Sequence, residues 1–351
     1  MVGQRFISLL EGHPWFDVVE VAASPNSAGK TYEEAVAGRW SLSTPVPETV
    51  RALRLKAVEE DLDAIAQNVD LVFSAIDADK AKIKELEERY AAAGVAVVSN
   101  NSAHRWTDDV PMLMPEVNAD HIALIDAQRA KRGWTTGLLA VKPNCSLQSY
   151  VPVLAALSAF KPKTVSVTTL QAISGAGKTF ATWPEMVDNC IPFISGEEEK
   201  SEKEPMKILG RVEGGHVVNA SVPAISATCI RVAVADGHMA SVAATFEQKP
   251  TLEQIIDALE HFQNPLAGLD LPSAPKQFIT YFPEPDRPQT RLDRDHEQGM
   301  GITCGRFRED GASGWKFVAL SHNTIRGAAG GAILGAELLY KKGYIKAKSS
   351  K

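Results

Sequence analysis

The first 140 residues alternate between segments of strand pattern and segments of helix pattern. Apolar residues recur at helical spacing from Val2 to Leu10, and Gly94 stands where a helix commonly ends in a left-handed residue. The segments typical of strands are 16–22, 69–74 and 95–98, and the charged segments with helical pattern are about 50–68 and 79–93. Strands that alternate with helices through short links favour a parallel sheet covered on both faces. We therefore expect a doubly wound, Rossmann-type α/β domain over residues 1–140.

The pattern changes after residue 140. Longer alternating segments follow one another through turns that are too short for parallel crossovers, at 164–170, 228–234, 238–246, 277–281, 301–307 and 314–320. Helical patterns at about 146–160 and 252–262 are expected to cover one face of the resulting mixed or antiparallel sheet. We predict a second, α+β domain over residues 141–322. A helix with a face of small residues, within 323–351, is expected to return to the first domain.

The composition excludes several classes of partner and compartment. The net charge of −6 provides no cationic field for nucleic acid, and no run of 18 apolar residues could cross a membrane. The N-terminus lacks the pattern of a signal peptide. The four cysteines are scattered and never form a CxxC pair, so neither a disulfide framework nor a metal site is expected. We expect a soluble, cytoplasmic protein that binds neither nucleic acid nor membranes.

Cys145 lies in the sequence that most suggests catalysis. A predicted strand ends in Pro143-Asn144, and a predicted helix begins at about Ser146. A thiol at a helix N-terminus is stabilised as the thiolate, and the first N–H groups of the helix can hold an oxyanion. A buried structural cysteine is the alternative. The remaining cysteines, in apolar or strand contexts, are interpreted as structural.

A reactive thiol needs an acid or base nearby, and His238 is the best-placed histidine. It follows a tight Asp236-Gly237 turn, and Arg231 lies seven residues earlier on the preceding strand, so both side chains can face one end of a sheet. A surface histidine in a hairpin turn is the alternative. The glycine-rich segments 174–177 and 327–331 fit a simple turn and close helix packing, and the acidic run 197–199 fits a solvated face.

Taken in order, eight segments resemble aspartate-semialdehyde dehydrogenase, in particular its fungal and archaeal branch. The resemblance covers essentially the whole chain and rests on residues 23–30, 99–105, 110–118, 143–146, 171–177, 194–200, 231–238 and 323–337. The family reduces 4-phospho-L-aspartate to L-aspartate 4-semialdehyde with NADPH, through a cysteine thioester, in lysine, threonine and methionine biosynthesis. The resemblance also implies a homodimer or homotetramer.

The resemblance assigns a role to each matching residue. It implies Cys145 as the nucleophile, His238 as the general acid and base, and Gln171 as the residue that positions the substrate. Arg231 would bind the substrate carboxylate, and Glu197 its ammonium group. Lys200 and Arg105 would bind phosphate.

The cofactor implied is NADP. Ser24 stands where a fold specific for NAD places an acidic residue, which leaves room for the 2′-phosphate and removes a repelling charge. The cofactor-binding residues implied by the resemblance are Gly3, Ser24, Ser27, Ser74, Ser174, Gly175 and Asn323.

Two departures from the family pattern stand out. Members of the family begin with a strand and a glycine-rich turn, of which only Gly3 is found here after Met1. We therefore expect this chain to lack the first strand and most phosphate-binding glycines, which would weaken cofactor binding. Lys142, Asn101 and His104 are unusual, and we expect them to modify the rim of the pocket.

Three alternatives remain. N-acetyl-glutamyl-phosphate reductase has an uncharged substrate nitrogen, to which Glu197 would be poorly suited. Malonyl-CoA reductase would not require Arg105 and Lys200 as a phosphate site. A chain without its first strand could also be a non-catalytic scaffold.

Overall fold

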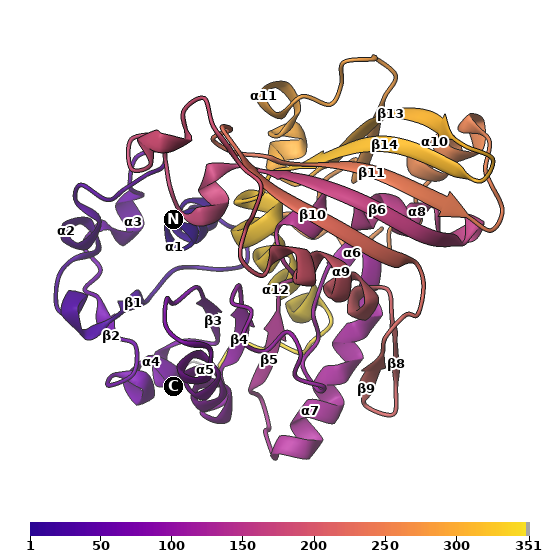
Figure 1. Cartoon of the computed structure of the whole chain (residues 1–351). Coiled ribbons are helices and arrows are strands. Elements are labelled where there is room, and N and C mark those ends of the chain that lie inside the picture. The colour runs from indigo at the N-terminus through magenta and orange to yellow at the C-terminus, as the bar shows by residue number, and fades with distance from the viewer. Residues whose placement is uncertain (349–351) are drawn as a thin grey trace.

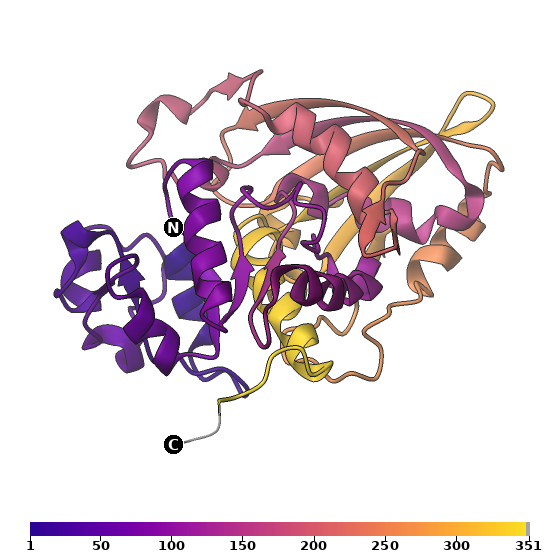
Figure 2. The same ribbon diagram turned by 90° about the horizontal axis from the view of Figure 1, so that it is seen from below.

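The computed structural model describes residues 1–348 and contains two main sheets (Figure 1). A three-stranded parallel sheet has the order β3-β4-β5, and a seven-stranded mixed sheet has the order β12-β13-β14-β11-β6-β10-β7. Figures 1 and 2 both show the indigo N-terminal residues on one side of the molecule and the yellow turn between β13 and β14 of the large sheet on the opposite side. No helix among the described residues is long and apolar enough to cross a membrane.

The smaller sheet has helices on both faces, as the alternating pattern predicts. Its strands are β3 (Leu71–Ser74), β4 (Ala96–Ser99) and β5 (Leu138–Val141). In β4, Val97 packs in one apolar cluster with Leu86 of α5 (Lys80–Ala92), whereas Ala96 and Val98 pack in another with Leu334 of α12 (Gly330–Lys341). Successive side chains of a strand point to opposite faces, so α5 and α12 cover the two faces. The Rossmann-type prediction is confirmed.

Local signals mark some helix boundaries correctly. α1 spans Val2–Leu10, as its apolar spacing predicts. The Asp79 side chain accepts a hydrogen bond from the Lys82 N–H and caps α5, and Gly94, just past the C-terminus of α5, has φ 87°.

Two predictions for residues 16–68 are wrong. Only Ala22–Ala23 (β1) forms a strand in the first segment, and the second contains α3 (Glu48–Arg51), β2 (Lys56–Ala57) and α4 (Leu62–Asn68) instead of one helix. The backbone N–H groups of Lys56 and Val58 donate to carbonyl groups of the β1 segment, at 3.0 and 2.9 Å. These long-range bonds replace the helical ones, so tertiary pairing overrides the local pattern.

The large sheet is mixed, as predicted. β6 pairs in parallel with β10, and β12 with β13, whereas β11 is antiparallel to both β6 and β14. Its strands are β6 (Pro162–Gln171), β7 (Cys190–Ile191), β10 (Ala224–Val232), β11 (His238–Phe246), β12 (Ile279–Phe282), β13 (Ile302–Asp310) and β14 (Gly314–Ser321).

The helical pattern of residues 146–160 forms three short pieces instead of one helix. They are a 3₁₀ turn at Ser146–Gln148, α8 (Val151–Ala156) and a second 3₁₀ turn at Ser158–Phe160. Pro152 has no N–H to donate to the carbonyl four residues earlier, so a continuous helix cannot form there. α10 (Leu252–Glu260) lies where predicted and is capped by Thr251.

α9 (Glu197–Ile208) packs along β10, where the neighbouring β7 is only two residues long. Glu198 and Glu202 accept hydrogen bonds from the Cys229 and Ala227 N–H groups of β10, at 3.2 and 3.1 Å. The acidic run is therefore only partly a solvated face, because its side chains satisfy an exposed strand edge.

The remaining elements connect these layers. They include α2 (Tyr32–Val36), α6 (Pro115–Asn118), α7 (Leu124–Arg132), the β8–β9 hairpin (Arg211–Glu213 and His216–Val218), α11 (Thr290–Asp293) and a π-helical turn at Ile325–Ala329 that precedes α12.

Candidate active site

The predicted catalytic residues lie at the ends of neighbouring strands. Gln171 ends β6 and pairs with Arg231 of β10, while Leu170 pairs with Met239, so His238 at the start of β11 lies at the same edge. Glu197 begins α9, and its side chain accepts a hydrogen bond from Gln171 Nε2 at 3.3 Å. The sheet register thus brings together residues that are up to 67 positions apart, from Gln171 to His238.

Cys145 follows β5 and is partly exposed. Gly327 packs against it, since a Cβ on Gly327 would lie 2.9 Å from the Cys145 Cβ. No long helix begins at Cys145 to stabilise its thiolate, contrary to the prediction from the sequence, because only a three-residue 3₁₀ turn follows it directly. Burial, and next the Glu197 carboxylate, raise the pKa of Cys145 to about 11, whereas Lys142, Arg105 and Arg231 oppose this rise.

Asn144 fixes the loop that carries Cys145. Its Oδ1 accepts from the Ser146 N–H at 2.8 Å, its Nδ2 donates to Glu197 at 3.0 Å, and its N–H donates to Glu204 at 2.7 Å. Neither Asn144 nor Glu204 is among the site residues predicted from the sequence. The Asx turn at Asn144 is a recognisable local signal, whereas Glu204, 60 residues away, has none.

Arg231 and His238 are held by the same backbone residue. Arg231 Nη1 donates to the Ala172 carbonyl at 2.7 Å, and the Ala172 N–H donates to His238 Nδ1 at 3.1 Å. Gly175 approaches both side chains: a Cβ there would lie 2.8 Å from Arg231 Nη1 and 3.0 Å from His238 Nε2. His238 is fully buried, so the surface-histidine alternative is wrong.

The hydrogen bond from Ala172 also sets the proton position on His238. A backbone N–H can only donate, so Nδ1 accepts and the neutral ring carries its proton on Nε2. Burial, and next Arg231, lower the pKa of His238 to about 3, so the ring is neutral at neutral pH. Nε2 is buried and has no partner among the described residues, which leaves its N–H available to a ligand.

Three of the four predicted ligand-binding charges are already paired. Glu197 forms an ion pair with Lys200 at 2.8 Å, and Arg105 Nη1 forms one with Glu204 at 2.8 Å. Arg105 Nε donates to the Lys142 carbonyl at 3.0 Å, which places this side chain beside the Cys145 loop.

Comparisons with known proteins identify the family of this chain. Residues 1–125 match the family model "Semialdehyde dehydrogenase, NAD binding domain", and residues 152–326 match "Semialdehyde dehydrogenase, dimerisation domain". The chain is 43% identical over 343 residues to aspartate-semialdehyde dehydrogenase from Archaeoglobus fulgidus, covering 97% of this chain and 96% of that protein. It is 39% identical over 357 residues to the Saccharomyces cerevisiae enzyme of the same name, covering 98% and 96%.

The chain belongs to the aspartate-semialdehyde dehydrogenase family.

A solved relative supports the same fold and cofactor class. The structure of the Candida albicans aspartate-semialdehyde dehydrogenase with NADP has a TM-score of 0.86 and 38% identity, covering 98% of this chain and 96% of that chain. Aspartate-semialdehyde dehydrogenase II from Vibrio cholerae has a TM-score of 0.73 and 26% identity, covering 97% and 96%.

The predicted cofactor residues fall into three groups. Asn323 Nδ2 donates to Ser174 Oγ at 2.8 Å, and Asn323 Oδ1 accepts from the Gly237 N–H at 2.8 Å, next to His238. Ser74 ends β3 and accepts from Asn101 Nδ2 at 3.1 Å. The third group lies near the N-terminus and comprises Gly3 of α1, with open space where a Cβ would point, and Ser24 and Ser27 at a 3₁₀ turn (Pro25–Ser27).

The structure corrects the expectation for the pocket rim. His104 is fully buried and donates to or accepts from Thr107 at 3.1 Å, and Lys142 is 2% exposed. Both are interior groups and not rim residues. The close-packing interpretation of residues 327–331 is right, because Gly327 and Gly331 contact Cys145 and Lys142.

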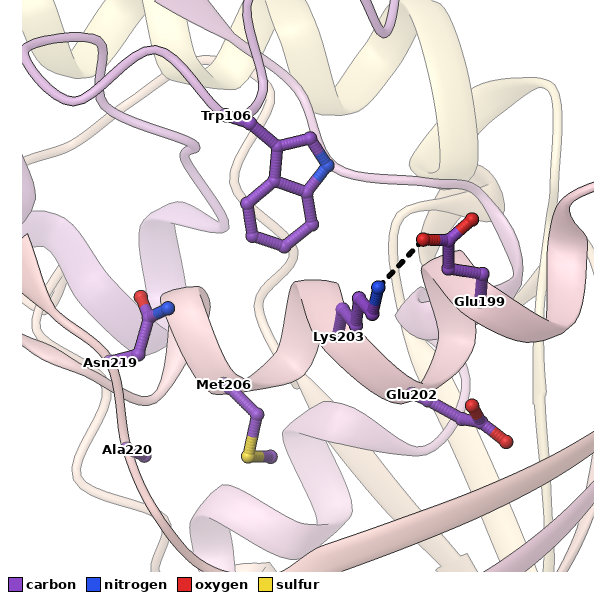
Figure 3. A pocket seen from close by; sticks show the side chains of 7 residues that line it. All are labelled: Trp106, Glu199, Glu202, Lys203, Met206, Asn219 and Ala220. Atoms are coloured by element: carbon purple, nitrogen blue, oxygen red, sulfur yellow. Dashed lines mark hydrogen bonds and ion pairs between the residues drawn. The ribbon is translucent and has the colours of Figure 1, made fainter.

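A groove of about 570 Å³ lies beside α9 (Figure 3). It is lined by Trp106, Glu199, Glu202, Lys203, Met206, Asn219 and Ala220. None of the predicted site residues is among them.

Proposed function

We propose that this chain catalyses the NADPH-dependent reductive dephosphorylation of 4-phospho-L-aspartate to L-aspartate 4-semialdehyde. Family membership supports the reaction, and the observation that carries the assignment to this chain's own residues is the grouping of Glu197, Arg231 and His238 at one edge of the large sheet, to which Asn144 ties the Cys145 loop through its hydrogen bond to Glu197. This reaction belongs to the biosynthesis of lysine, threonine and methionine.

The charges around Cys145 suit a small amino acid. Arg231 offers a planar, bidentate group that matches a carboxylate, and Glu197 offers a carboxylate that matches an ammonium. Glu197 is 8% exposed, so its charge needs a cation, which Lys200 supplies in the free protein. A free ammonium fits this position better than an acetylated nitrogen, which argues against N-acetyl-glutamyl phosphate as the substrate.

The reaction requires Cys145 as a thiolate. The sulfur attacks the acyl carbon, a C–S bond forms, and the bond from carbon to the phosphate oxygen breaks, giving a thioester and inorganic phosphate. Arg105 and Lys200 receive the phosphate. His238 Nε2–H donates a hydrogen bond to the acyl oxygen, where negative charge develops, and aldehyde is released as this oxygen re-forms its double bond to carbon and the C–S bond breaks, which returns Cys145 as the thiolate. When bound, NADPH supplies the hydride that reduces the thioester.

The residues present fit NADP. Ser24 brings no carboxylate to the turn at 25–27, and Arg54 Nη1 donates to the Gly29 carbonyl at 2.8 Å, so a cation lies beside this turn. Neutral hydroxyls next to a cation suit a 2′-phosphate. The nicotinamide end of the cofactor would be held beside His238 by Ser174, Gly175 and Asn323. Ser74, at the carboxyl end of β3, would line the crevice that holds the middle of the cofactor.

The open face of the large sheet supports assembly of identical subunits, as a homodimer or homotetramer. Small polar residues of three adjacent strands are exposed there, namely Thr164, Ser166, Ser226, Thr228 and Ser241. A broad sheet face without a covering helix is suited to packing against another sheet. The free cysteines, Cys145, Cys190, Cys229 and Cys304, fit a reducing compartment such as the cytoplasm.

The test is turnover of the purified chain and of Cys145→Ser. We expect the wild type to form NADPH from L-aspartate 4-semialdehyde, phosphate and NADP, and Cys145→Ser to lose this activity while its circular dichroism stays unchanged. Cys190→Ser is the control, since Cys190 is an exposed thiol of β7. Full activity in Cys145→Ser, or none in the wild type, would refute the proposal.

A further inference from the structure

Glu87 is a buried acidic residue of α5 that lies behind the carboxyl ends of two neighbouring strands. It is 2% exposed, and its Oε1 accepts hydrogen bonds from Ser99 Oγ at 2.6 Å and from Asn101 Nδ2 at 3.2 Å. The Asn101 N–H donates to Ser99 Oγ at 3.0 Å, which closes a small ring of hydrogen bonds. Ser99 ends β4 and pairs with Ser74, which ends β3. A single buried carboxylate therefore fixes the residues that follow β4.

The ends of β3 and β4 border the place where a dinucleotide binds. Ligands of parallel α/β sheets bind outside the carboxyl ends of the strands, and both strands belong to the NAD-binding domain. Phe6 of α1 stacks on Phe73 of β3, with ring centroids 4.8 Å apart. The helix that carries Gly3 therefore lies beside the strand that ends in Ser74, so two predicted cofactor-binding residues lie on neighbouring elements.

Glu87 decides which end of the Asn101 amide faces each neighbour. A carboxylate oxygen accepts hydrogen bonds, so the Asn101 atom that lies 3.2 Å from Glu87 Oε1 is the NH₂ group. The same Nδ2 donates to Ser74 Oγ at 3.1 Å. Both amide hydrogens are then used, and Oδ1 of this half-buried side chain is left without a donor among the described residues.

This orientation also sets what Ser74 can offer to a ligand. Its oxygen accepts from Asn101, and its hydroxyl proton has no acceptor among residues 1–348. Ser74 thus presents a donor, and Asn101 Oδ1 presents an acceptor. A hydroxyl donor suits a phosphate oxygen, and an amide oxygen suits a ribose hydroxyl. Both of these groups occur in the middle of NADP, between the adenosine and the nicotinamide.

The second carboxylate oxygen of Glu87 indicates a role beyond stability. Oε2 is buried and accepts no hydrogen bond from the part of the chain that the structure describes, and His104 Nε2 lies 4.0 Å from it. A buried carboxylate oxygen without a donor costs free energy of folding. Packing does not explain why a carboxylate stands here, whereas the two donors that it orders do.

We propose that Glu87 is a positioning residue for NADP, which orients Asn101 and, through it, Ser74 toward the pyrophosphate and ribose in the middle of the cofactor. Without the Glu87 acceptor, the Asn101 amide can turn over and place Oδ1 against Ser74. The Ser74 hydroxyl would then donate to Asn101, and the donor that faces the cofactor would be lost. The inference rests on the proposed function for the identity of the cofactor.

The experiment measures the dissociation constants of NADP and of adenosine 2′-phosphate by isothermal titration calorimetry of the full chain, without substrate. Adenosine 2′-phosphate carries the adenosine end of NADP and lacks the pyrophosphate and the nicotinamide. A lost hydrogen bond to a charged group weakens binding about 10-fold or more, so we expect this loss for NADP in Glu87→Met. The affinity for adenosine 2′-phosphate should change less than about twofold, whereas a damaged domain would lose both ligands.

Two variants of α5 serve as controls. Glu87→Gln keeps an acceptor oxygen for Ser99 and Asn101 and loses no bond at Oε2, so it should bind NADP within about threefold of the wild type. Glu88→Met removes the next residue, whose side chain is 44% exposed and pairs with Arg132 at 3.0 Å. It should change neither affinity. Unchanged NADP binding in Glu87→Met, or an equal loss of both ligands, would overturn the inference.

Ser74→Ala provides a test that leaves Glu87 intact. It should weaken NADP binding about as much as Glu87→Met, and the double variant should lose less than about threefold more, because both changes remove the same donor. Unchanged binding in Ser74→Ala, or fully additive losses, would refute the role of Glu87. None of these measurements uses turnover. An inactive chain with the expected affinities therefore refutes only the proposed function, and an active chain with normal NADP binding in Glu87→Met refutes only this inference.

Discussion

Gly175→Ala tests whether the site depends on close approach of the backbone at residues 174–177. The added Cβ would lie 2.8 Å from Arg231 Nη1 and 3.0 Å from His238 Cε1 and Nε2. Ordinary contacts of this kind are about 3.5 Å or longer, so each side chain must move by about 0.5–0.7 Å. Arg231 cannot move freely, because Nη1 also donates to the Ala172 carbonyl at 2.7 Å.

This displacement should reduce catalysis far more than stability. Misplacement of catalytic groups by about 1 Å can cost about 100-fold in rate, so we expect kcat/KM to fall about 10- to 100-fold. The fold should tolerate the change, because the colliding atoms are ends of side chains and Gly175 does not have a left-handed φ. The assay is NADP-dependent oxidation of L-aspartate 4-semialdehyde with phosphate, together with the thermal unfolding midpoint.

Gly177→Ala is a control in the same turn. Gly177 has φ +69° and nothing within 4 Å of a Cβ, so alanine there should cost about 1–2 kcal/mol of stability and leave the site intact. The two variants should therefore rank oppositely, Gly175→Ala lower in activity and Gly177→Ala lower in stability. A Gly175→Ala enzyme with kcat/KM within about threefold of wild type would refute the argument.

Three further predictions concern other parts of the molecule. Glu116→Gln leaves the fully buried Arg326 without its ion-pair partner, which should cost about 3–5 kcal/mol of stability and lower the thermal unfolding midpoint by about 4–7 °C for a chain of 351 residues. Glu199→Gln, which removes one partner of an exposed ion pair, should change this midpoint by about 1 °C or less. Equal effects of the two variants would contradict the prediction. The pKa values of His238 and His322 are lowered to about 3 and about 4, so below the unfolded value of 6.5 the unfolded state binds more protons than the folded state. The free energy of unfolding, measured by urea titration, should therefore fall as the pH is lowered from about 6.5 to about 4, by up to about 1.4 kcal/mol per pH unit for each histidine. A free energy of unfolding that does not change over this range would count against the prediction. Arg231→Lys should raise KM for the semialdehyde about tenfold or more and change KM for NADP less than about twofold; the reverse ranking would show that Arg231 does not bind the substrate.

The sequence specifies the elements whose signals are local. Asp79 and Gly94 bound α5 as predicted, and the apolar runs at 69–74 and 95–98 become β3 and β4. The resemblance, which rests on short motifs such as 143–146, identifies the family from residue types and their order. The site roles assigned from it remain predictions.

Elements held by distant partners are not predictable in this way. Residues 50–68 have a helical pattern, yet backbone bonds to the β1 segment divide them. The acidic run of α9 has the composition of a solvated face, yet Glu198 and Glu202 bind β10. In both cases the competing interaction comes from residues far away in the sequence.

The amino-acid sequence by itself determined which chemical groups are available and where the local turns and caps fall. It placed a thiol after Pro143-Asn144 and an imidazole after Asp236-Gly237. Only the tertiary structure decided how these groups behave, because burial and the charges that face them set their protonation. The pKa of Cys145 is raised and that of Lys142 lowered by the same enclosure, which forms only when Gly327 and Gly331 pack against a loop about 180 residues earlier.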